Sequence, residues 1–399
     1  MGSIPAEWEI VPLVDVVDFL DGYRRPVKDS ERSKMQGEIP YYGASGIVDY
    51  VNDFLFDDDL ILLGEDGENI LSRNCRLAFK VSGKAWVNNH AHVLKPKAQA
   101  NIDYLVEYLE SLDYGGYNTG TAQPKLNKQV CTQIPVLVPP LPEQSAIATA
   151  LSDVDALLSS LDALIAKKRD IKQAAMQQLL TGKIRLPGFE SNAGFRQTEV
   201  GVIPKDWEVS TVGRQFDVTL GKMLDAEKNI GELKPYIGNR NVRWGSVSVS
   251  ELPLMRLTRA DMEKFRLRNG DLLVCEGGDV GRAAIWDAPV EECYYQKALH
   301  RLRPLRGFNS RLMVGLLRLW SDRGTLANYV TQTSIAHLPR EKFMEIPMPV
   351  PSSLEQTAIA EVLAEMDAEQ EVLEARRDKT RLLKQGMMQE LLTGKTRLV

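Results

Sequence analysis

The chain has 399 residues, of which 44% are hydrophobic and 26% are charged, and its formal net charge is −5. This composition predicts hydrophobic cores in roughly two to four domains, and no apolar run is long enough to span a bilayer. The four cysteines are scattered without a CxxC pair, so we expect a reducing, cytoplasmic location with neither disulfides nor a zinc knuckle. The acidic balance alone argues against nucleic-acid binding, for which a basic domain is the usual footprint.

Residues 1–140 are predicted to form an irregular α+β domain. Short β-like runs such as Leu60–Leu63 and Cys75–Val81 alternate with turn signals, and Asp103–Leu112 indicates a helix. The stretch Asp49–Glu68 is strongly acidic, and such a run is most often a solvated face.

Residues 141–184 predict one long helical arm. No Pro or Gly interrupts the segment from Glu143 to about Leu180, prolines precede it, and Thr181-Gly182 is a typical C-terminal signal. Apolar residues recur at spacings of four and three, which predicts a coiled-coil seam. The expected seam residues are Ile147, Leu151, Val154, Leu158, Leu161 and Ile165, followed by a shift to Leu164, Ile171, Ala175 and Leu179.

The same order then repeats. A linker, 185–203, leads to a second α+β domain, 204–352, which contains the basic stretch Lys234–Arg268, and to a second arm, 353–399. Leu141–Leu186 and Ser353–Leu398 align without a gap, with about half of the positions identical. The sequence therefore predicts an internal pseudo-two-fold repeat, in which the two arms pair as an antiparallel coiled coil that separates two globular domains.

Two polar residues interrupt the seam of the second arm. Gln370 and Arg377 stand where the first arm has Leu158 and Ile165. In an antiparallel pair we expect them to lie near the end of the first arm, with Arg377 pairing with Asp170 or staying solvated. Polar seam groups cost stability but can fix register and partner choice.

The two domains, called heads below, echo each other only at short framework segments. PYYG (40–43) matches PYIG (235–238), and LILLGEDG (60–67) matches LLVCEGGD (272–279). AHVLKP (91–96) matches LHRLRP (299–304), and TGTAQPKL (119–126) matches TQTSIAHL (331–338). The arms are similar and the heads divergent, which favours one scaffold that carries two specificities.

The sequence contains no recognisable catalytic motif. It has no GxxxxGK[ST], GxSxG or HExxH, and its single Pro-Pro, at 139–140, does not fit the loop of an amino-methyltransferase. Gly277–Gly281 is interpreted as a turn, and His90 and His92 as strand residues with alternating faces, since no acidic or cysteine ligand stands at a supporting spacing. We therefore predict no catalytic, cofactor or metal site in this chain.

The chain resembles the specificity subunits of type I restriction–modification systems. The resemblance covers essentially the full length and depends on three repeated motifs. IPxxW opens each half at Ile4 and Ile203, and a proline-rich joint followed by EQ stands at 134–148 and 346–360. The arms end in LLTGKxRL, at 179–186 and 391–398. The second joint departs from the pattern, with Ser352-Ser353 after Pro351.

The resemblance implies that each head is a target recognition domain that reads one half of a bipartite, asymmetric site in double-stranded DNA. It implies that the paired helices set the unread spacer and bind two modification subunits, which use S-adenosylmethionine to methylate adenine. Restriction subunits would supply translocation and cleavage with ATP and Mg, and the chain itself would bind no cofactor. Two alternatives stay open: a protein-binding coiled-coil scaffold, and a fused methyltransferase or nuclease with divergent motifs.

Base reading needs side chains that pair donors and acceptors with base edges, such as Arg or Lys for guanine and Asn or Gln for adenine. Our candidates are loop residues beside the framework segments. In the first head they are Tyr42, Ser45, Asn88, Asn89, Thr119, Thr121, Gln123 and Lys125. In the second head they are Asn239, Arg240, Asn241, Arg243, Thr331, Thr333 and Ser334.

Overall fold

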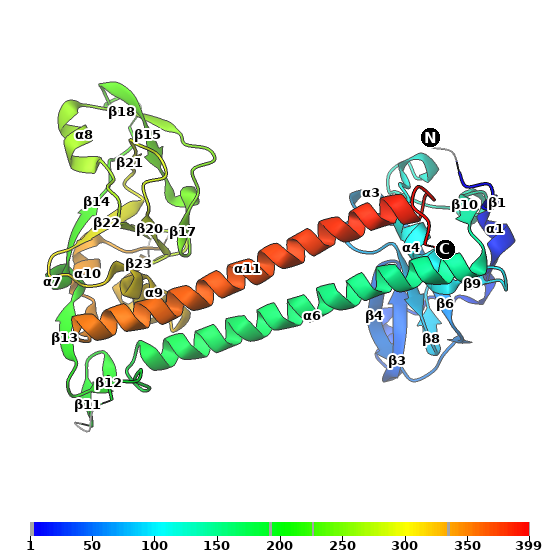
Figure 1. Cartoon of the computed structure of the whole chain (residues 1–399), viewed down its shortest axis with the longest axis horizontal. Coiled ribbons are helices and arrows are strands. Elements are labelled where there is room, and N and C mark those ends of the chain that lie inside the picture. Colours follow the sequence, from blue (N-terminus) through cyan, green and yellow to red (C-terminus); the bar gives the residue numbers. More distant parts are fainter. Residues whose placement is uncertain (1–3, 191–193, 226, 333–335, 399) are drawn as a thin grey trace. The chain divides into compact units, whose positions relative to one another are not determined.

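The computed structural model describes residues 4–190, 194–225, 227–332 and 336–398. The chain divides into two compact units (Figure 1). Unit 1 is discontinuous and comprises Met1–Ala163 and Glu374–Val399, whereas unit 2 is the continuous segment Leu164–Leu373. Each unit thus holds one head and portions of both long helices, α6 (Leu141–Leu179) and α11 (Ser353–Leu391), each 39 residues long.

The head of unit 1 is built on two four-stranded sheets. The first has the order β2-β9-β6-β7, with strands Val17–Phe19, Ala91–Pro96, Leu60–Gly64 and Ala78–Val81. The second has the order β4-β3-β8-β5, with strands Gly46–Val51, Gln36–Gly43, Lys84–Val87 and Phe56–Asp57. A separate pair, β1 (Glu9–Pro12) with β10 (Pro135–Val138), joins the start of the head to its end. Helix α4 (Ile102–Ser111) covers β7 and part of the core, with α1, α2, α3 and α5 as shorter helices at Leu13–Val16, Asp29–Arg32, Asn69–Ser72 and Lys128–Thr132.

The head of unit 2 repeats this plan. Its main sheet has the order β14-β22-β19-β20, with strands Phe216–Leu220, Leu299–Pro304, Asp271–Cys275 and Ala283–Trp286. A three-stranded sheet has the order β18-β15-β21, with strands Leu254–Leu257, Glu232–Ile237 and Tyr294–Tyr295. The closing pair is β13 (Glu208–Thr211) with β25 (Pro347–Val350), and α9 (Ser310–Asp322) takes the place of α4. The smaller elements used below are α8 (Arg259–Phe265), α10 (Arg340–Glu345), β16 (Val242–Arg243), β17 (Ser246–Val247), β23 (Thr331–Gln332) and β24 (Ala336–His337).

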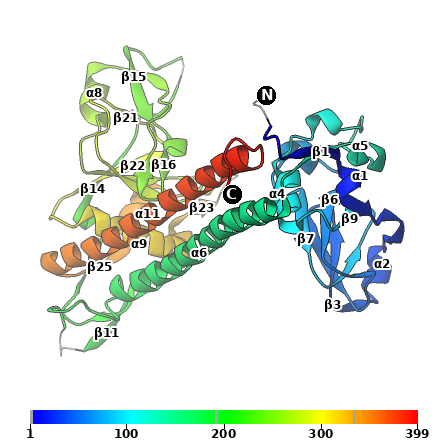
Figure 2. The ribbon, with the colours of Figure 1, turned by 45° about the vertical axis from the view of Figure 1, so that its right-hand side comes forward.

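Within each unit the two long helices lie side by side and run in opposite directions (Figures 1 and 2). In unit 1, Ile147 and Leu151 near the start of α6 share a core with Leu391 and Leu392 at the end of α11. In unit 2, Leu179 and Leu180 at the end of α6 share a core with residues such as Ile359 near the start of α11. The α+β heads and the antiparallel helical arms are therefore confirmed.

The seam departs from the predicted residues at Leu164 and Ile171. Leu161 and Ile165 are 4% and 2% exposed, but Leu164 and Ile171 are 38% and 44% exposed, so the predicted shift is wrong for these two. It is confirmed for Leu179, which is 6% exposed, and for Ala175, which packs against the same core. The four-three spacing continues instead through Lys168 and Lys172, which form ion pairs with Glu369 and Asp367. A lysine can occupy a seam because its aliphatic stem covers apolar surface while its ammonium reaches a carboxylate at the edge.

The predicted partner of Arg377 is also wrong. Its guanidinium lies 2.7 Å from Asp378 and 3.7 Å from Asp162, and not beside Asp170. Arg377 is half-buried, as expected for a polar residue at the edge of a seam. Among the described helices, none is long and apolar enough to cross a membrane.

Candidate nucleic-acid interface

In the first head, four loops that are far apart in the sequence meet beside the two sheets. They are the turn 43–46 between β3 and β4, residues 64–67 after β6, the turn 88–90 after β8, and the loop 118–126. Backbone hydrogen bonds join them: Asn88 N–H donates to Tyr42 at 3.1 Å, and Glu65 N–H donates to His90 at 2.8 Å. Leu126 N–H closes the group by donating to the Glu65 carbonyl at 2.7 Å. All eight candidate residues of this head lie in or directly beside these loops, which we call loop cluster 1.

The side chains of loop cluster 1 fall into two groups. Ser45, Asn89, Thr121 and Gln123 are exposed and, among the described residues, make no side-chain hydrogen bond. The others are partly engaged in building the loops: the Asn88 amide oxygen accepts from His90 N–H at 2.8 Å, and the Thr119 hydroxyl donates to the Lys125 carbonyl at 3.0 Å. Tyr42 is half-buried against Phe79, and burial raises the pKa of its phenol.

A largely buried network of ion pairs and hydrogen bonds holds the loop 118–126 in place. His92, only 1% exposed, donates from Nδ1 to Asp21 at 2.8 Å and from Nε2 to the Leu126 carbonyl at 2.8 Å. Burial by itself lowers the pKa of His92, but the hydrogen bonds and charges of Asp21 and Cys131 together outweigh it and raise the pKa to about 10. Glu65 is held by Arg24 at 2.7 Å and by Lys125 at 3.3 Å. The cations of this network are therefore paired with its carboxylates within loop cluster 1.

The second head forms an equivalent group of loops, loop cluster 2. Here Gln296 N–H donates to Ile237, Glu276 N–H to Ala298, and Leu338 N–H to Glu276, which are the counterparts of the three bonds in the first head. The strand registers make Glu276 equivalent to Glu65, because Leu63 pairs with His92 as Val274 pairs with His300. The ungapped match of LILLGEDG to LLVCEGGD, which placed Gly64 opposite Glu276, is therefore wrong by one residue.

The candidate residues of the second head differ in whether their side chains are already hydrogen-bonded within the protein. Asn239 donates to the Gly277 carbonyl at 2.8 Å and accepts from Arg282 at 2.9 Å. The Asn241 amide accepts from Gly238 N–H at 2.9 Å and donates to the carbonyls of Ser248 and Glu251, so both asparagines help to build the turn. Arg240 and Arg243 are exposed and have no partner among the described residues.

The last part of loop cluster 2 carries the remaining candidates. The Thr331 hydroxyl lies 2.9 Å from His337 Nε2. Thr333 and Ser334 lie outside the described residues.

Sequence reasoning missed three residues of loop cluster 2. Gln296 and Lys297 occupy the places of Asn88 and Asn89, and His337 occupies the place of Lys125. The signal was present: Lys297 stands two residues before LHRLRP, as Asn89 stands two residues before AHVLKP. Lys297 is exposed, like Asn89.

The repeated sequence motifs meet in a second kind of cluster, which we call the clasp, one in each unit. In unit 1, Glu143 of the EQ motif is 0% exposed, accepts from the Trp8 indole N–H at 2.9 Å, and is bound by Arg397 at 2.8 Å. In unit 2, Glu355 accepts from the Trp207 indole at 2.9 Å and from Arg185 at 2.7 Å. Each clasp thus joins the start of a head, the start of the helix that follows it, and the end of the other helix.

The glutamine of the EQ motif fastens the head to its helix. The Gln144 side-chain oxygen accepts from Asn101 N–H at 2.7 Å, and its amide donates to the Pro139 carbonyl at 2.8 Å. Asn101 is the N-cap of α4, whose side chain accepts from Asp103 and Tyr104. Gln356 makes the same bonds to Asn309, the N-cap of α9, and to Pro351. Ser352-Ser353 after Pro351 therefore leaves the joint unchanged.

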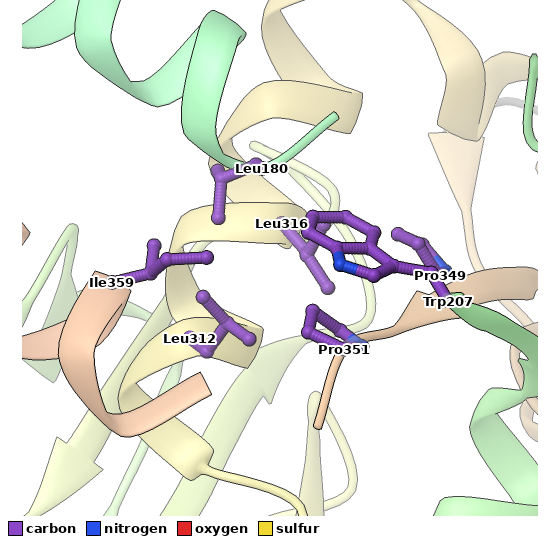
Figure 3. A pocket seen from close by; sticks show the side chains of 7 residues that line it. All are labelled: Leu180, Trp207, Leu312, Leu316, Pro349, Pro351 and Ile359. Carbon is purple, nitrogen blue, oxygen red and sulfur yellow. The ribbon is translucent and has the colours of Figure 1, made fainter. Parts of the chain in front are cut away.

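Apolar residues close the unit 2 clasp around Trp207 (Figure 3). Trp207 shares this space with Leu180 from the end of α6, Ile359 from α11, and Leu312 and Leu316 from α9. The space between them is too small to hold a water molecule. The glycine of the terminator, Gly182, has a positive φ of +67° and approaches Pro204 so closely that a Cβ would lie 2.5 Å from the proline ring. Gly394 makes the same approach to Pro5 in unit 1.

We expect Gly182→Ala to destabilise unit 2 clearly more than Gly307→Ala. Both glycines have positive φ, but the space around Gly307 is open, so that change carries only the conformational cost of about 1 kcal/mol. Gly182→Ala adds a collision with Pro204 and Trp207. Urea denaturation of both variants would measure the difference, and equal losses would show that the close approach to Pro204 is unimportant.

Two duplicated heads, each presenting a loop cluster on a common frame and fastened to paired helices, define a bipartite recognition protein. The chain belongs to the family described as the type I restriction modification DNA specificity domain, whose model matches residues 5–172 and 204–380.

Relatives and solved structures agree with this assignment. The chain is 25% identical to the type I restriction enzyme MjaVIII specificity subunit of Methanocaldococcus jannaschii, over 99% of this chain and 94% of that one. It is 38% identical to a putative type I restriction enzyme specificity subunit of Haemophilus influenzae, over 38% of each chain. The crystal structure of the S subunit from M. genitalium has the same fold, with a TM-score of 0.61, 15% identity, and coverage of 98% of this chain and 97% of that one.

Proposed function

We propose that this chain is the sequence-reading subunit of a type I restriction–modification enzyme, in which each loop cluster reads one half of a bipartite site in double-stranded DNA. The observation that carries the proposal is the equivalence of the two loop clusters. The same backbone hydrogen bonds recur in both, while the exposed side chains differ. A constant frame with variable donors and acceptors is what reading two different half-sites requires.

Within this proposal, the side chains without internal partners are the base readers. In the first head these are Ser45, Asn89, Thr121 and Gln123, with Lys125 beside them. In the second head the exposed side chains of the loop cluster are the cations Arg240, Arg243 and Lys297, which are placed to contact the DNA. Asn88, Asn239 and Asn241 are positioning residues, because their amides hold the loops in shape. Loop residues presented by a rigid frame are well suited to recognition.

The chain is proposed to act in the cytoplasm without chemistry of its own, together with two modification subunits and with restriction subunits. S-adenosylmethionine, ATP and Mg are assigned to those partners. The exposed apolar residues Leu164 and Ile171 support a docking role for the helices, since they lie seven residues apart and so share one face of α6. Together the helices would also hold the heads at the spacing of the two half-sites.

Mapping methyladenine in the genome of a host that expresses the chain with its modification subunits tests the proposal. Gln123→Ala should relax positions in one half-site only and leave the other half-site unchanged. A bidentate contact to adenine is worth about 1–3 kcal/mol, so roughly tenfold less discrimination is expected at one base pair. Arg323→Gln, an exposed change outside the loop clusters, is the control. A variant that alters both half-sites would contradict the assignment of one head to each half-site.

A further inference from the structure

The two heads carry opposite charge. Residues 1–140 hold 13 lysines and arginines against 20 aspartates and glutamates, a net charge of −7. Residues 204–352 hold 22 against 18, a net charge of +4. The overall acidity of the chain therefore hides a basic second head, and a DNA backbone would meet very different fields at the two.

The difference is concentrated at equivalent positions of the loop clusters. Where loop cluster 2 has Arg240 and Lys297, loop cluster 1 has Ser45 and Asn89. Where loop cluster 2 has Gly277, loop cluster 1 has Asp66, whose carboxylate lies 2.9 Å from His90. Each of these exchanges makes the second cluster more positive or the first more negative.

The lysines and arginines of the two loop clusters also differ in whether they form ion pairs within the protein. In loop cluster 1, Glu65 holds both Lys125 and Arg24, so their charges are compensated inside the protein. In loop cluster 2, Arg240 and Arg243 make no ion pair among the described residues, and exposed Lys297 follows Gln296 at the same surface. Asn239, which bonds to Gly277, brings the Arg240 turn against the loop 277–279. Within the described part of the chain, loop cluster 2 therefore presents two cations without an ion pair, Arg240 and Arg243, and an exposed Lys297 whose charge acts on Glu276.

We infer that the second head binds the DNA phosphates electrostatically, whereas the first head, which is acidic overall, contributes chiefly discrimination between bases. This inference rests on the proposed function. A protein that neutralises phosphates releases counterions, and each such contact contributes about 0.9 to the slope of log affinity against log salt. The cations of loop cluster 2 should thus account for most of the salt dependence of binding.

The test uses the full-length chain assembled with its modification subunits and two duplexes, one cognate and one of random sequence. Binding is titrated between roughly 50 and 200 mM salt. The triple variant Arg240→Gln/Arg243→Gln/Lys297→Gln should lower the slope by about 2 to 3 on both duplexes. The matched variant of the first head is Arg25→Gln/Lys125→Gln/Lys128→Gln, which removes three exposed cations in and beside loop cluster 1. It should lower the slope by less than about 1, because that head is acidic overall.

A third variant separates local contacts from overall charge. Arg306→Gln/Arg311→Gln/Arg323→Gln removes the same charge from exposed positions of the second head outside loop cluster 2, and it should leave the slope nearly unchanged. Equal slopes for the variants of the two heads would overturn the inference, as would a large effect of this third variant. Failure of the wild-type complex to bind either duplex would instead contradict the proposed function. Circular dichroism would show that each variant is folded.

Discussion

Replacing Arg185 with methionine should lower the free energy of unfolding of unit 2 by about 3 kcal/mol, because the buried carboxylate of Glu355 loses its cationic partner. Glu355 is 1% exposed and receives two hydrogen bonds from Arg185 and one from Trp207. Without Arg185, the indole N–H of Trp207 is the one side-chain donor to this carboxylate that remains among the described residues. Methionine keeps much of the apolar contact of the arginine stem, so the change reports mainly on the ion pair.

Hydrogen exchange resolved by peptide would locate this loss. Protection should fall in unit 2, residues 164–373, and stay unchanged in unit 1. Arg397→Met is the matched variant, since Arg397 binds Glu143 in the same way and should weaken unit 1 alone. Arg323→Met controls for the loss of an arginine at an exposed position. A loss from Arg185→Met no larger than that from Arg323→Met would show that the clasp is not a source of stability.

The second large effect concerns pH, because equivalent histidines have opposite protonation. His300 in β22 is buried, and burial lowers its pKa to about 4. Its Nε2 is bonded to the Leu338 carbonyl, and its Nδ1 has no partner among the described residues. Between pH 6.5 and about 4 the unfolded chain binds a proton that the folded head excludes, so acidification destabilises unit 2. The shift corresponds to about 3 kcal/mol.

His92 in the first head behaves in the opposite sense. The pKa raised to about 10 means that its contribution is fully present below pH 6.5 and is lost as the pH rises toward about 10. The largest raising contribution comes from the hydrogen bond to Asp21, to which Cys131 adds. The equivalent of Asp21 in the second head is Leu220, the residue paired with His300 in the sheet. Head 2 therefore lacks the carboxylate that keeps the histidine of head 1 charged.

Leu220→Asp should raise the pKa of His300 and remove the acid sensitivity that this histidine gives to unit 2. Leu220→Asn is the matched control, because it has nearly the same shape without the charge. Stability of each unit, measured by hydrogen exchange at pH 4.5, 6 and 8, would compare both variants with the wild type. An identical pH profile for the Asp and Asn variants would contradict the role assigned to the missing carboxylate.

The arms could be predicted well because a helix leaves a period in its sequence. The same period could not show that Lys168 and Lys172 continue the seam, since their role depends on carboxylates of the other helix. A short gapless match likewise could not detect a displacement of one residue, which only strand pairing revealed at Glu65 and Glu276.

For the candidate site, the framework segments correctly led to loops that meet in space. These segments could not distinguish Asn241, whose side-chain amide is hydrogen-bonded to backbone groups, from Arg240, whose side chain is exposed. The clasp was equally hidden, because Arg397 and Glu143 are 254 positions apart and each motif is incomplete without the other. Sequence patterns show local periodicity and turn-forming residues. Hydrogen bonds between residues this far apart in the sequence can be identified only once the fold is known.

The discontinuity of unit 1 has a consequence for synthesis on the ribosome. Unit 2 is one uninterrupted segment and can close its core while the end of the chain is still being made. Unit 1 begins first but needs Leu391, Leu392 and Arg397 to complete its core and its clasp. During that interval Ile147 and Leu151 lack the partners that later bury them, so the first head to emerge is the last to be finished. A nascent chain of this kind exposes its apolar helix face from the synthesis of Leu151 until that of Leu391, which is the period in which chaperones act.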